Sequence, residues 1–134
     1  MLNGLTWLST TQNSDGSWGL LDSVDVDTTE TLYAFKACGS TTTDYNEGIS
    51  WLAAQPDDLS VDELARKLLV ISSSGTDVSA LRDTLVSTKN ADGGWGFIAG
   101  RQSDPSTTSL ALHALKAANY SDTTVIYQAL NYLT

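Results

Sequence analysis

One sequence motif occurs twice in this chain and limits the folds that it can adopt. Residues 8–19 read Leu-Ser-Thr-Thr-Gln-Asn-Ser-Asp-Gly-Ser-Trp-Gly, and residues 85–96 read Leu-Val-Ser-Thr-Lys-Asn-Ala-Asp-Gly-Gly-Trp-Gly. Each copy is followed by a segment that contains Thr-Thr and ends in Ala-Phe-Lys-Ala or Ala-Leu-Lys-Ala. Internal similarity on this scale is typical of repeat proteins, in which each unit buries its apolar face against a neighbour. The sequence therefore predicts a repeat fold.

The apolar residues between the two motifs recur with the spacing of α-helices. Leu64, Leu68 and Ile71 form a stripe at spacings of four and three, and Ser60 with Glu63 is typical of the capping box that begins a helix. Glycine, proline and asparagine interrupt the pattern between the periodic segments. We expect seven helices and no sheet, with helices near residues 4–11, 28–37, 46–55, 61–73, 77–88, 106–118 and 122–133.

Cap residues indicate where individual helices begin and end. Asp27 or Thr28 is expected to cap the helix that runs to Ala37, and Gly39 is expected to end it. Cys38, which precedes this glycine, is expected to be a small packing residue.

The chain is expected to form a single domain, residues 1–134, that belongs to a longer array of repeats. Residues 128–134 read like residues 3–9, so another loop of the same kind would come next. Met1 stands directly before the first repeat helix, as an expression start would. The first and last repeats each leave an apolar face without a neighbour, so we expect a homodimer that forms through the terminal helices.

The charge balance excludes two classes of partner. The chain has 16 acidic and 7 basic residues and a formal net charge of −9. Nucleic acids and anionic membrane surfaces require basic patches, so neither is expected as a partner. No apolar run has the length that a membrane span needs, so membrane insertion is not expected either. A low charged fraction, 17%, with acids spread over loops favours an extracellular or cell-surface location.

The first copy of the motif carries the residues of a known repeat. Residues 4–18 read Gly-x-x-Trp-Leu-x-x-x-Gln-x-x-x-Gly-x-Trp, which resembles the QW repeat of squalene and hopene cyclases and, more loosely, of protein prenyltransferase β subunits. The second copy has Thr84 and Lys89 in place of the aromatic residue and the glutamine, and residues 48–55 keep only the helical half. The resemblance implies an all-α fold, a partial α/α toroid of about three helical hairpins plus one helix.

The motif residues also have a structural interpretation that does not depend on the resemblance. Asp-Gly forms a tight turn, the following glycine lets the backbone pass close to the indole, and the tryptophan seals the end of the hairpin. Gln12 is placed to bond exposed backbone groups. We expect all four tryptophans to be packed, with the alternative that one of them lines a ligand cavity, and structural roles for Trp7, Gln12, Asp15, Gly16, Trp18, Trp51, Asp92, Gly93 and Trp95.

One acidic segment leaves three interpretations open. Residues 23–29 read Ser-Val-Asp-Val-Asp-Thr-Thr, and class II terpene cyclases carry Asp-x-Asp-Asp-Thr at the start of an inner helix, where the central aspartate is a general acid. The resemblance implies that Asp27 is the proton donor, with Asp25 beside it, although Thr28 stands where the last aspartate is expected. The same acids can instead cap a helix. They can also bind a cation such as Ca²⁺ together with Asp22. We favour capping, because Asp104 precedes Thr-Thr in the second repeat as well.

The prenyltransferase resemblance implies a zinc site made of an aspartate, a cysteine and a histidine. Cys38 and His113 lie in different repeats, so we do not expect them to converge on a metal or the chain to hold a cofactor. His113 is expected to be a partly buried polar neighbour.

The sequence as a whole favours a non-catalytic binding or adhesion scaffold in a larger secreted or surface protein. A fragment of a class II terpene cyclase is the first alternative. A carbohydrate-active toroid that uses acidic and aromatic residues in an open groove is the second. The ligand expected from these readings is apolar or a carbohydrate.

Overall fold

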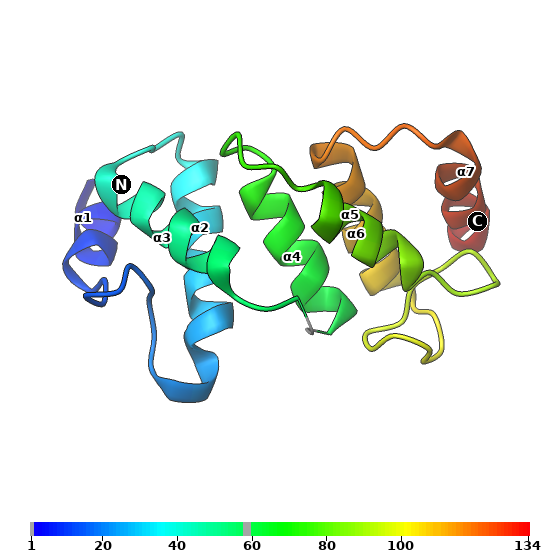
Figure 1. Ribbon diagram of the computed structural model, residues 1–134, viewed down its shortest axis with the longest axis horizontal. Helices are drawn as coiled ribbons and strands as arrows, with labels where there is room; N and C mark the ends of the chain where they lie inside the picture. Colours follow the sequence, from blue (N-terminus) through cyan, green and yellow to red (C-terminus); the bar gives the residue numbers. More distant parts are fainter. Residues whose placement is uncertain (1, 58–59) are drawn as a thin grey trace. The chain divides into compact units, whose positions relative to one another are not determined.

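The computed structural model describes residues 2–57 and 60–134 of the chain. Within those ranges it contains seven α-helices, one short 3₁₀ turn and no strand (Figure 1). The helices are α1 (Leu2–Thr10), α2 (Val24–Ala37), α3 (Thr43–Ala54), α4 (Val61–Ile71), α5 (Ser79–Ser87), α6 (Pro105–Ala117) and α7 (Thr123–Leu133). The predicted all-α class is confirmed.

The chain divides into two compact units, Met1–Gln55 and Pro56–Thr134. The first unit contains α1, α2 and α3, and the second contains α4, α5, α6 and α7. Each unit includes one copy of the repeated motif, which begins in the last residues of α1 or α5 and continues into the loop before α2 or α6.

Polar side chains begin several of the helices. At the start of α4, the Ser60 hydroxyl accepts the Glu63 N–H at 3.2 Å, and the Glu63 carboxylate accepts the Ser60 N–H at 3.0 Å. The capping box predicted from the sequence is therefore confirmed. The side chains of Thr42, Asp104 and Asp122 cap α3, α6 and α7 in the simpler way, each accepting one backbone N–H.

Helix α2 begins earlier than the sequence predicts. It starts at Val24, directly after a 3₁₀ turn over Leu21–Ser23, so the prediction of Asp27 or Thr28 as its N-cap is wrong. Asp27 lies in the first turn of the helix, where its carboxylate accepts the Ser23 hydroxyl at 2.6 Å. The 3₁₀ turn leads the backbone into the helix without a side-chain cap.

Helices α2 and α6 end with the same backbone motif. The Ser40 N–H donates to the Phe35 carbonyl at 3.0 Å, and Gly39 has a φ of 66°. This is the Schellman arrangement, and it confirms the expected end of the helix at Gly39. Helix α6 ends in the same way with Asn119, at a φ of 54°, in place of the glycine. Cys38 is exposed in this turn, so its expected packing role is wrong.

The first unit has an aromatic core. The ring of Phe35 lies between Trp18, at 5.8 Å between centroids, and Tyr45, at 6.4 Å. All three side chains are buried, together with Leu32, Ile49 and Leu52. A Cβ at Gly48 of α3 would lie 2.5 Å from the Trp18 ring, so glycine lets α3 approach the indole closely.

The second unit has an aliphatic core built around α4. This helix packs against both α5 and α6, and its buried side chains join those of the two helices and the second motif. The cluster consists of Val61, Leu64, Ala65, Leu68, Leu69, Leu81, Leu85, Trp95, Ala111, Ala114, Leu115 and Ala129.

Two glycines with similar backbone angles allow the close approach at the second motif to be tested. Gly93 and Gly75 have φ values of 93° and 82°, but a Cβ at Gly93 would lie 2.5 Å from the Gln128 carbonyl oxygen, whereas one at Gly75 meets nothing within 4 Å. Gly75→Ala is expected to cost about 1–2 kcal/mol from backbone strain alone. Gly93→Ala is expected to cost a further 1–3 kcal/mol, roughly, from the clash. Urea unfolding followed by tryptophan fluorescence measures both, and equal losses would contradict the close approach.

Candidate functional site

The first motif forms a loop that is organised by an aspartate. Asp15 Oδ1 accepts the Ser17 N–H at 3.0 Å and the Ser17 hydroxyl at 2.6 Å. The Gly16 N–H donates to the Asn13 carbonyl at 3.0 Å, and Gly16 has a φ of 94°, which glycine adopts without strain. The tight Asp-Gly turn expected from the sequence is present.

The second motif forms the same loop, but the hydroxyl that bonds its aspartate comes from a residue farther along the chain. Asp92 Oδ1 accepts the Gly94 N–H at 3.0 Å and a hydroxyl at 2.8 Å, which here belongs to Ser103. A Cβ at Gly94 would lie 2.7 Å from the Ser103 Cβ, so the missing side chain leaves room for the distant serine. The Asn90 amide donates to this hydroxyl at 2.9 Å, as the matching asparagine does to Ser17 in the first copy. Sequence reasoning missed Ser103, because no local pattern marks it.

Each motif tryptophan is held at both its ring and its backbone. The Trp18 indole N–H donates to the Leu8 carbonyl at the end of α1 at 2.7 Å. The Thr28 hydroxyl of α2 accepts the Trp18 backbone N–H at 2.8 Å and donates to the Trp18 carbonyl at 3.1 Å. The same bonds recur in the second copy between Trp95, Leu85 and Thr108. Both threonines are fully buried, so the Thr-Thr signature supplies a loop anchor and not a cap.

Two further side chains tie the first loop to α3. Gln12 Nε2 donates to the carbonyls of Gly16 and Asp44, both at 2.8 Å, which confirms its expected role. The partly buried Trp51 of α3 donates its indole N–H to Asp15 Oδ2 at 3.1 Å. In the second unit Lys89 reaches α7 instead, through a bond to a glutamine side chain at 2.8 Å.

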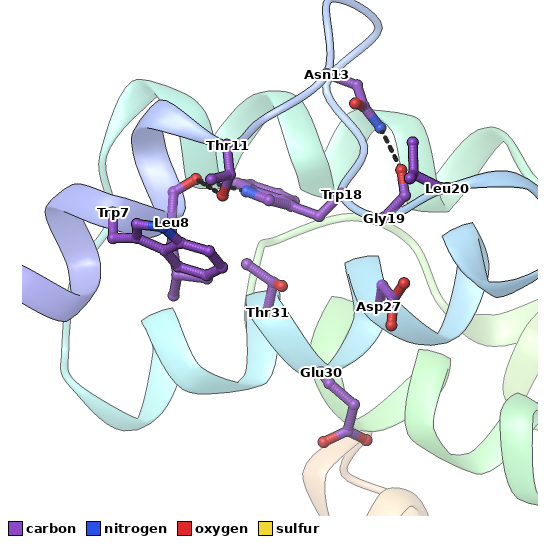
Figure 2. A pocket seen from close by; sticks show the side chains of 10 residues that line it. All are labelled: Trp7, Leu8, Thr11, Asn13, Trp18, Gly19, Leu20, Asp27, Glu30 and Thr31. Atoms are coloured by element: carbon purple, nitrogen blue, oxygen red, sulfur yellow. Dashed lines mark hydrogen bonds between the residues drawn. The ribbon is translucent and has the colours of Figure 1, made fainter.

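A groove runs between α1 and α2 in the first unit. It encloses about 510 Å³, with Trp7 and Leu8 of α1 opposite Thr31 of α2, and with Asp27 and Glu30 along α2 (Figure 2). Its remaining lining residues are Thr11, Asn13, Trp18, Gly19 and Leu20.

The side chains at the mouth of this groove are unusually exposed for their size. Trp7 is 64% exposed and Leu20 is 78% exposed. The expectation that Trp7 is packed is therefore wrong, because the α1 face that carries it borders the groove. Trp18, which forms the inner wall, is only 3% exposed.

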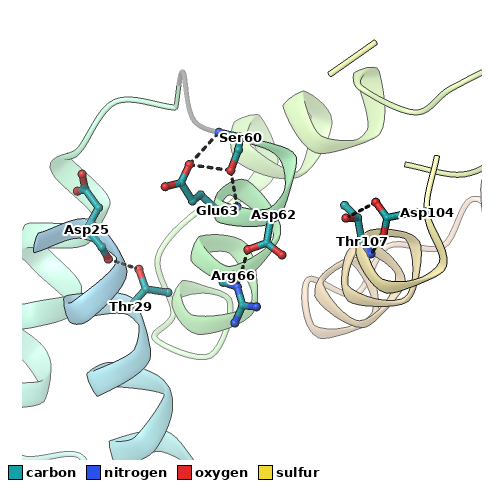
Figure 3. A network of polar contacts seen from close by, with 8 residues as sticks. All are labelled: Asp25, Thr29, Ser60, Asp62, Glu63, Arg66, Asp104 and Thr107. Atoms are coloured by element: carbon teal, nitrogen blue, oxygen red, sulfur yellow. Dashed lines mark hydrogen bonds and ion pairs between the residues drawn. The ribbon is translucent and has the colours of Figure 1, made fainter. Parts of the chain in front are cut away.

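The acidic segment does not gather into a cluster. Asp25 makes its bond through its backbone carbonyl, which accepts the Thr29 hydroxyl at 2.7 Å (Figure 3), and Asp22 is exposed in the 3₁₀ turn. Asp27 alone of the three lines the groove. Among residues 2–57 and 60–134, no three His, Cys, Asp or Glu side chains are placed to hold a metal ion, so the Ca²⁺ candidate is not assembled.

The remaining candidate ligands, His113 and Cys38, belong to different units. His113 on α6 is exposed, so the expectation of partial burial is wrong. It lies on the face of α6 that carries the exposed Lys116, away from the buried Ala111 and Leu115. Cys38 belongs to the other unit.

No protein-family model matches the chain, and a search of curated proteins finds no match. None of the helices in the described part of the chain combines the length and apolar character that a membrane crossing requires.

The loop aspartates should make stability depend on pH. The Gly94 N–H and then the Ser103 hydroxyl hold the pKa of Asp92 below its ordinary value of 3.8. A pKa lowered in the folded state stabilises the protein above the unfolded value, and this contribution is lost as the pH falls through the folded value. We expect Asp92→Asn to weaken the loss of stability between about pH 5 and pH 2.

Urea midpoints measured over that pH range provide the test. Asp22→Asn removes an exposed acid outside the two Asp-Gly turns and serves as the matched control. If Asp92→Asn leaves the pH dependence as steep as that of the unmodified protein, the role of the loop carboxylate in this dependence is refuted.

Proposed function

We propose that this chain is a repeat module of the α/α-toroid type, related in design to QW-repeat proteins, that acts as a non-catalytic binding scaffold. Such a module would belong to a larger secreted or cell-surface protein. The repetition of the same anchored loop between α1 and α2 and between α5 and α6 supports this interpretation. Recurrence of one structural unit along the chain is typical of repeat proteins.

The proposal rests on one observation: the polar side chains of the motif already form bonds within the protein. Asp15 and Asp92 hold their own loops, and Thr28 and Thr108 hold the tryptophans. These groups are committed to structural bonds. What the first unit offers to a ligand is an apolar groove with exposed walls, which is suited to binding.

A fragment of a class II terpene cyclase is the second candidate, and one observation favours it. The Asp27 carboxylate borders a groove whose walls include Trp7 and Trp18. A general acid strong enough to protonate an alkene needs neighbouring carboxyl groups and a site closed to water. Asp27 instead accepts the Ser23 hydroxyl in an open groove that also contains the exposed Trp7, so we rank catalysis below binding. A carbohydrate-active toroid shares the acidic and aromatic lining and ranks third.

Incubation with squalene separates the first two candidates. We expect the purified protein to return the polyene unchanged, as measured by gas chromatography with mass spectrometry. Asp27→Asn and Asp25→Asn serve as paired variants, because only the first changes a residue that lines the groove. A cyclised product that disappears in Asp27→Asn and persists in Asp25→Asn would replace the scaffold proposal with catalysis.

We also propose that the chain self-associates through the face between α6 and α7. Tyr127 and Leu130 of α7 are 65% and 44% exposed. A second groove of about 510 Å³ lies beside them, lined by Leu112, Leu115, Lys116, Asn119, Tyr120, Ile126 and Leu130. An isologous dimer would cover this apolar face on both copies.

Sedimentation velocity over a concentration series up to about 100 µM tests the association, since dimers of micromolar affinity are populated there. We expect Leu130→Asp to shift the protein toward monomer, because a carboxylate cannot be buried in this face without a partner. Asn131→Asp adds the same charge at an exposed neighbouring position on α7 and is expected to leave the dimer intact. A protein that stays monomeric throughout the series rules the association out.

A further inference from the structure

The two ends of the α1–α2 groove differ in chemistry. Trp7 and Leu8 lie toward one end, and Leu20 and the Asp27 carboxylate lie toward the other (Figure 2). The buried Trp18 forms the inner wall. The groove encloses about 510 Å³. Clefts that hold small molecules typically enclose roughly 300–1,000 Å³ and are mostly apolar with a few polar groups, so the groove has the size and lining of such a site.

One carboxylate supplies the charge that a ligand in this groove can use. Asp27 Oδ2 accepts the Ser23 hydroxyl at 2.6 Å, and because this donor is neutral the carboxylate keeps its negative charge. No basic side chain among residues 2–57 and 60–134 forms an ion pair with Asp27. Glu30 also lines the groove but already has an interaction within the protein, which leaves Asp27 as the carboxylate that a ligand can pair with.

The loop before α2 holds the Asp27 carboxylate in position. Gly19 has a φ of 92°, and a Cβ at this residue would overlap the carboxylate, so the glycine lets the carboxylate lie against the loop. The bond from the Ser23 hydroxyl holds it from α2's own side. A group that is already held in its binding position loses little conformational freedom when a ligand binds, and it therefore contributes more to affinity and selectivity.

The lining of the groove selects among ligands by their charge. None of the described residues that line it is basic, so an anionic ligand would meet Asp27 with no cation to offset the repulsion. A neutral apolar ligand would displace water from the carboxylate without replacing its hydrogen bonds, which is costly. An ammonium group would replace that water with a charge-assisted hydrogen bond. A molecule with an apolar body and one ammonium group therefore matches both ends of the groove.

We propose that the α1–α2 groove binds a small amphiphilic cation, whose apolar body lies along Trp7 and Leu8 and whose ammonium group bonds the Asp27 carboxylate. This inference rests on the proposed scaffold function and names the chemical class of its ligand. An uncharged polyene does not meet this description, because it has no group to pair with Asp27.

Probes that share one alkyl chain and differ in their head group test the proposal. Octylammonium is the cation, octanol is the neutral probe and octanoate is the anion. Isothermal titration calorimetry at low salt, where charge pairing is least screened, measures their binding to the whole chain. We expect octylammonium to bind at least about tenfold more tightly than octanol, and octanoate to bind more weakly than octanol.

A shorter cation separates the groove from general attraction to an acidic protein. The chain has a formal net charge of −9, which attracts any cation. Butylammonium has the same head group as octylammonium but covers less of the apolar wall, so it is expected to bind at least about tenfold more weakly.

Two substitutions on α2 locate the ammonium group. Asp27→Asn keeps an oxygen that can accept the Ser23 hydroxyl but removes the charge, and it is expected to weaken octylammonium about tenfold and to leave octanol unchanged. Asp25→Asn removes the same charge from the first turn of α2, at a residue that does not line the groove. It is expected to change the affinity for octylammonium by less than about twofold.

A third substitution locates the apolar body. Trp7→Ala removes a side chain that is 64% exposed, so it is expected to leave the helix content unchanged, which circular dichroism checks. We expect it to weaken octylammonium and octanol by the same factor, because both probes lose the same apolar contact.

Three outcomes would overturn the inference. Octanol could bind as tightly as octylammonium, Asp25→Asn could act like Asp27→Asn, or none of the probes could bind. The comparison of head groups on the unmodified protein decides the question even where Asp27→Asn lowers the stability of the fold. The scaffold function is tested separately, because turnover of squalene would replace it whatever these probes do.

Discussion

A buried threonine hydroxyl that bridges the backbone of a tryptophan is the interaction on which both repeats depend. The loop before α2 and the loop before α6 are irregular, so their buried peptide groups have no helix or sheet partner. Thr28 and Thr108 satisfy the N–H and the carbonyl of the tryptophan with one side chain each. Leaving such a buried group without a partner costs about 1–3 kcal/mol. The threonine therefore allows the loop to turn inward and to bury the indole ring of its tryptophan.

Once the indole is buried, its ring N–H fixes the helix that precedes the loop. Trp18 and Trp95 each bond a carbonyl near the end of that helix, where backbone carbonyls lack partners within the helix. The glycine of the Asp-Gly turn then comes within contact distance of another helix of the same unit, α3 in the first unit and α7 in the second. One anchored tryptophan thus positions three helices, and the loop functions as the junction of the repeat.

The interactions of the loop are more constant than the residues that make them. The hydroxyl that bonds the loop aspartate comes from Ser17 in one copy and from Ser103 in the other, and the atom occupies an equivalent place in both bonding networks. The side chain that links the loop to the next helix is Gln12 in the first copy, where it bonds α3, and Lys89 in the second, where it bonds α7. In the second copy, each of these bonds is made by a residue at a different position or of a different type. The second copy therefore departs from the motif in sequence, although it keeps the geometry of the loop.

Local signals in the sequence were sufficient for the helices but not for the site. The capping box at Ser60, the end of α2 at Gly39 and the role of Gln12 all follow from side chains acting on nearby backbone, and all are confirmed. The N-cap predicted at Asp27 or Thr28 is wrong, because α2 already begins at Val24, directly after a 3₁₀ turn. Thr28 instead bonds the Trp18 backbone.

Exposure was the property that local patterns predicted least well. Trp7, Cys38 and His113 were expected to be at least partly covered, and all three are exposed. Whether a helix face is covered depends on which other helix packs on it, and amphipathic spacing does not carry that information. The α1–α2 groove itself could not be predicted for the same reason, since its residue types also occur in covered faces.

The acids of the groove determine how any ligand must lie in it. Covering a carboxylate is costly unless its charge stays hydrated or is paired, so a ligand that covers the groove must leave the Asp27 carboxylate, which accepts the Ser23 hydroxyl, in contact with water or supply a cation. When the ends of α2 and α6 are aligned, the second unit has Thr107 at the position of Asp27 and does not have this constraint. The first unit can therefore bury Trp7, Leu8 and Leu20 under a ligand only if the Asp27 carboxylate stays hydrated or its charge is neutralised by a cation of the ligand. An apolar contact at the centre would supply affinity, and the Asp27 carboxylate would limit how the ligand can lie in the groove.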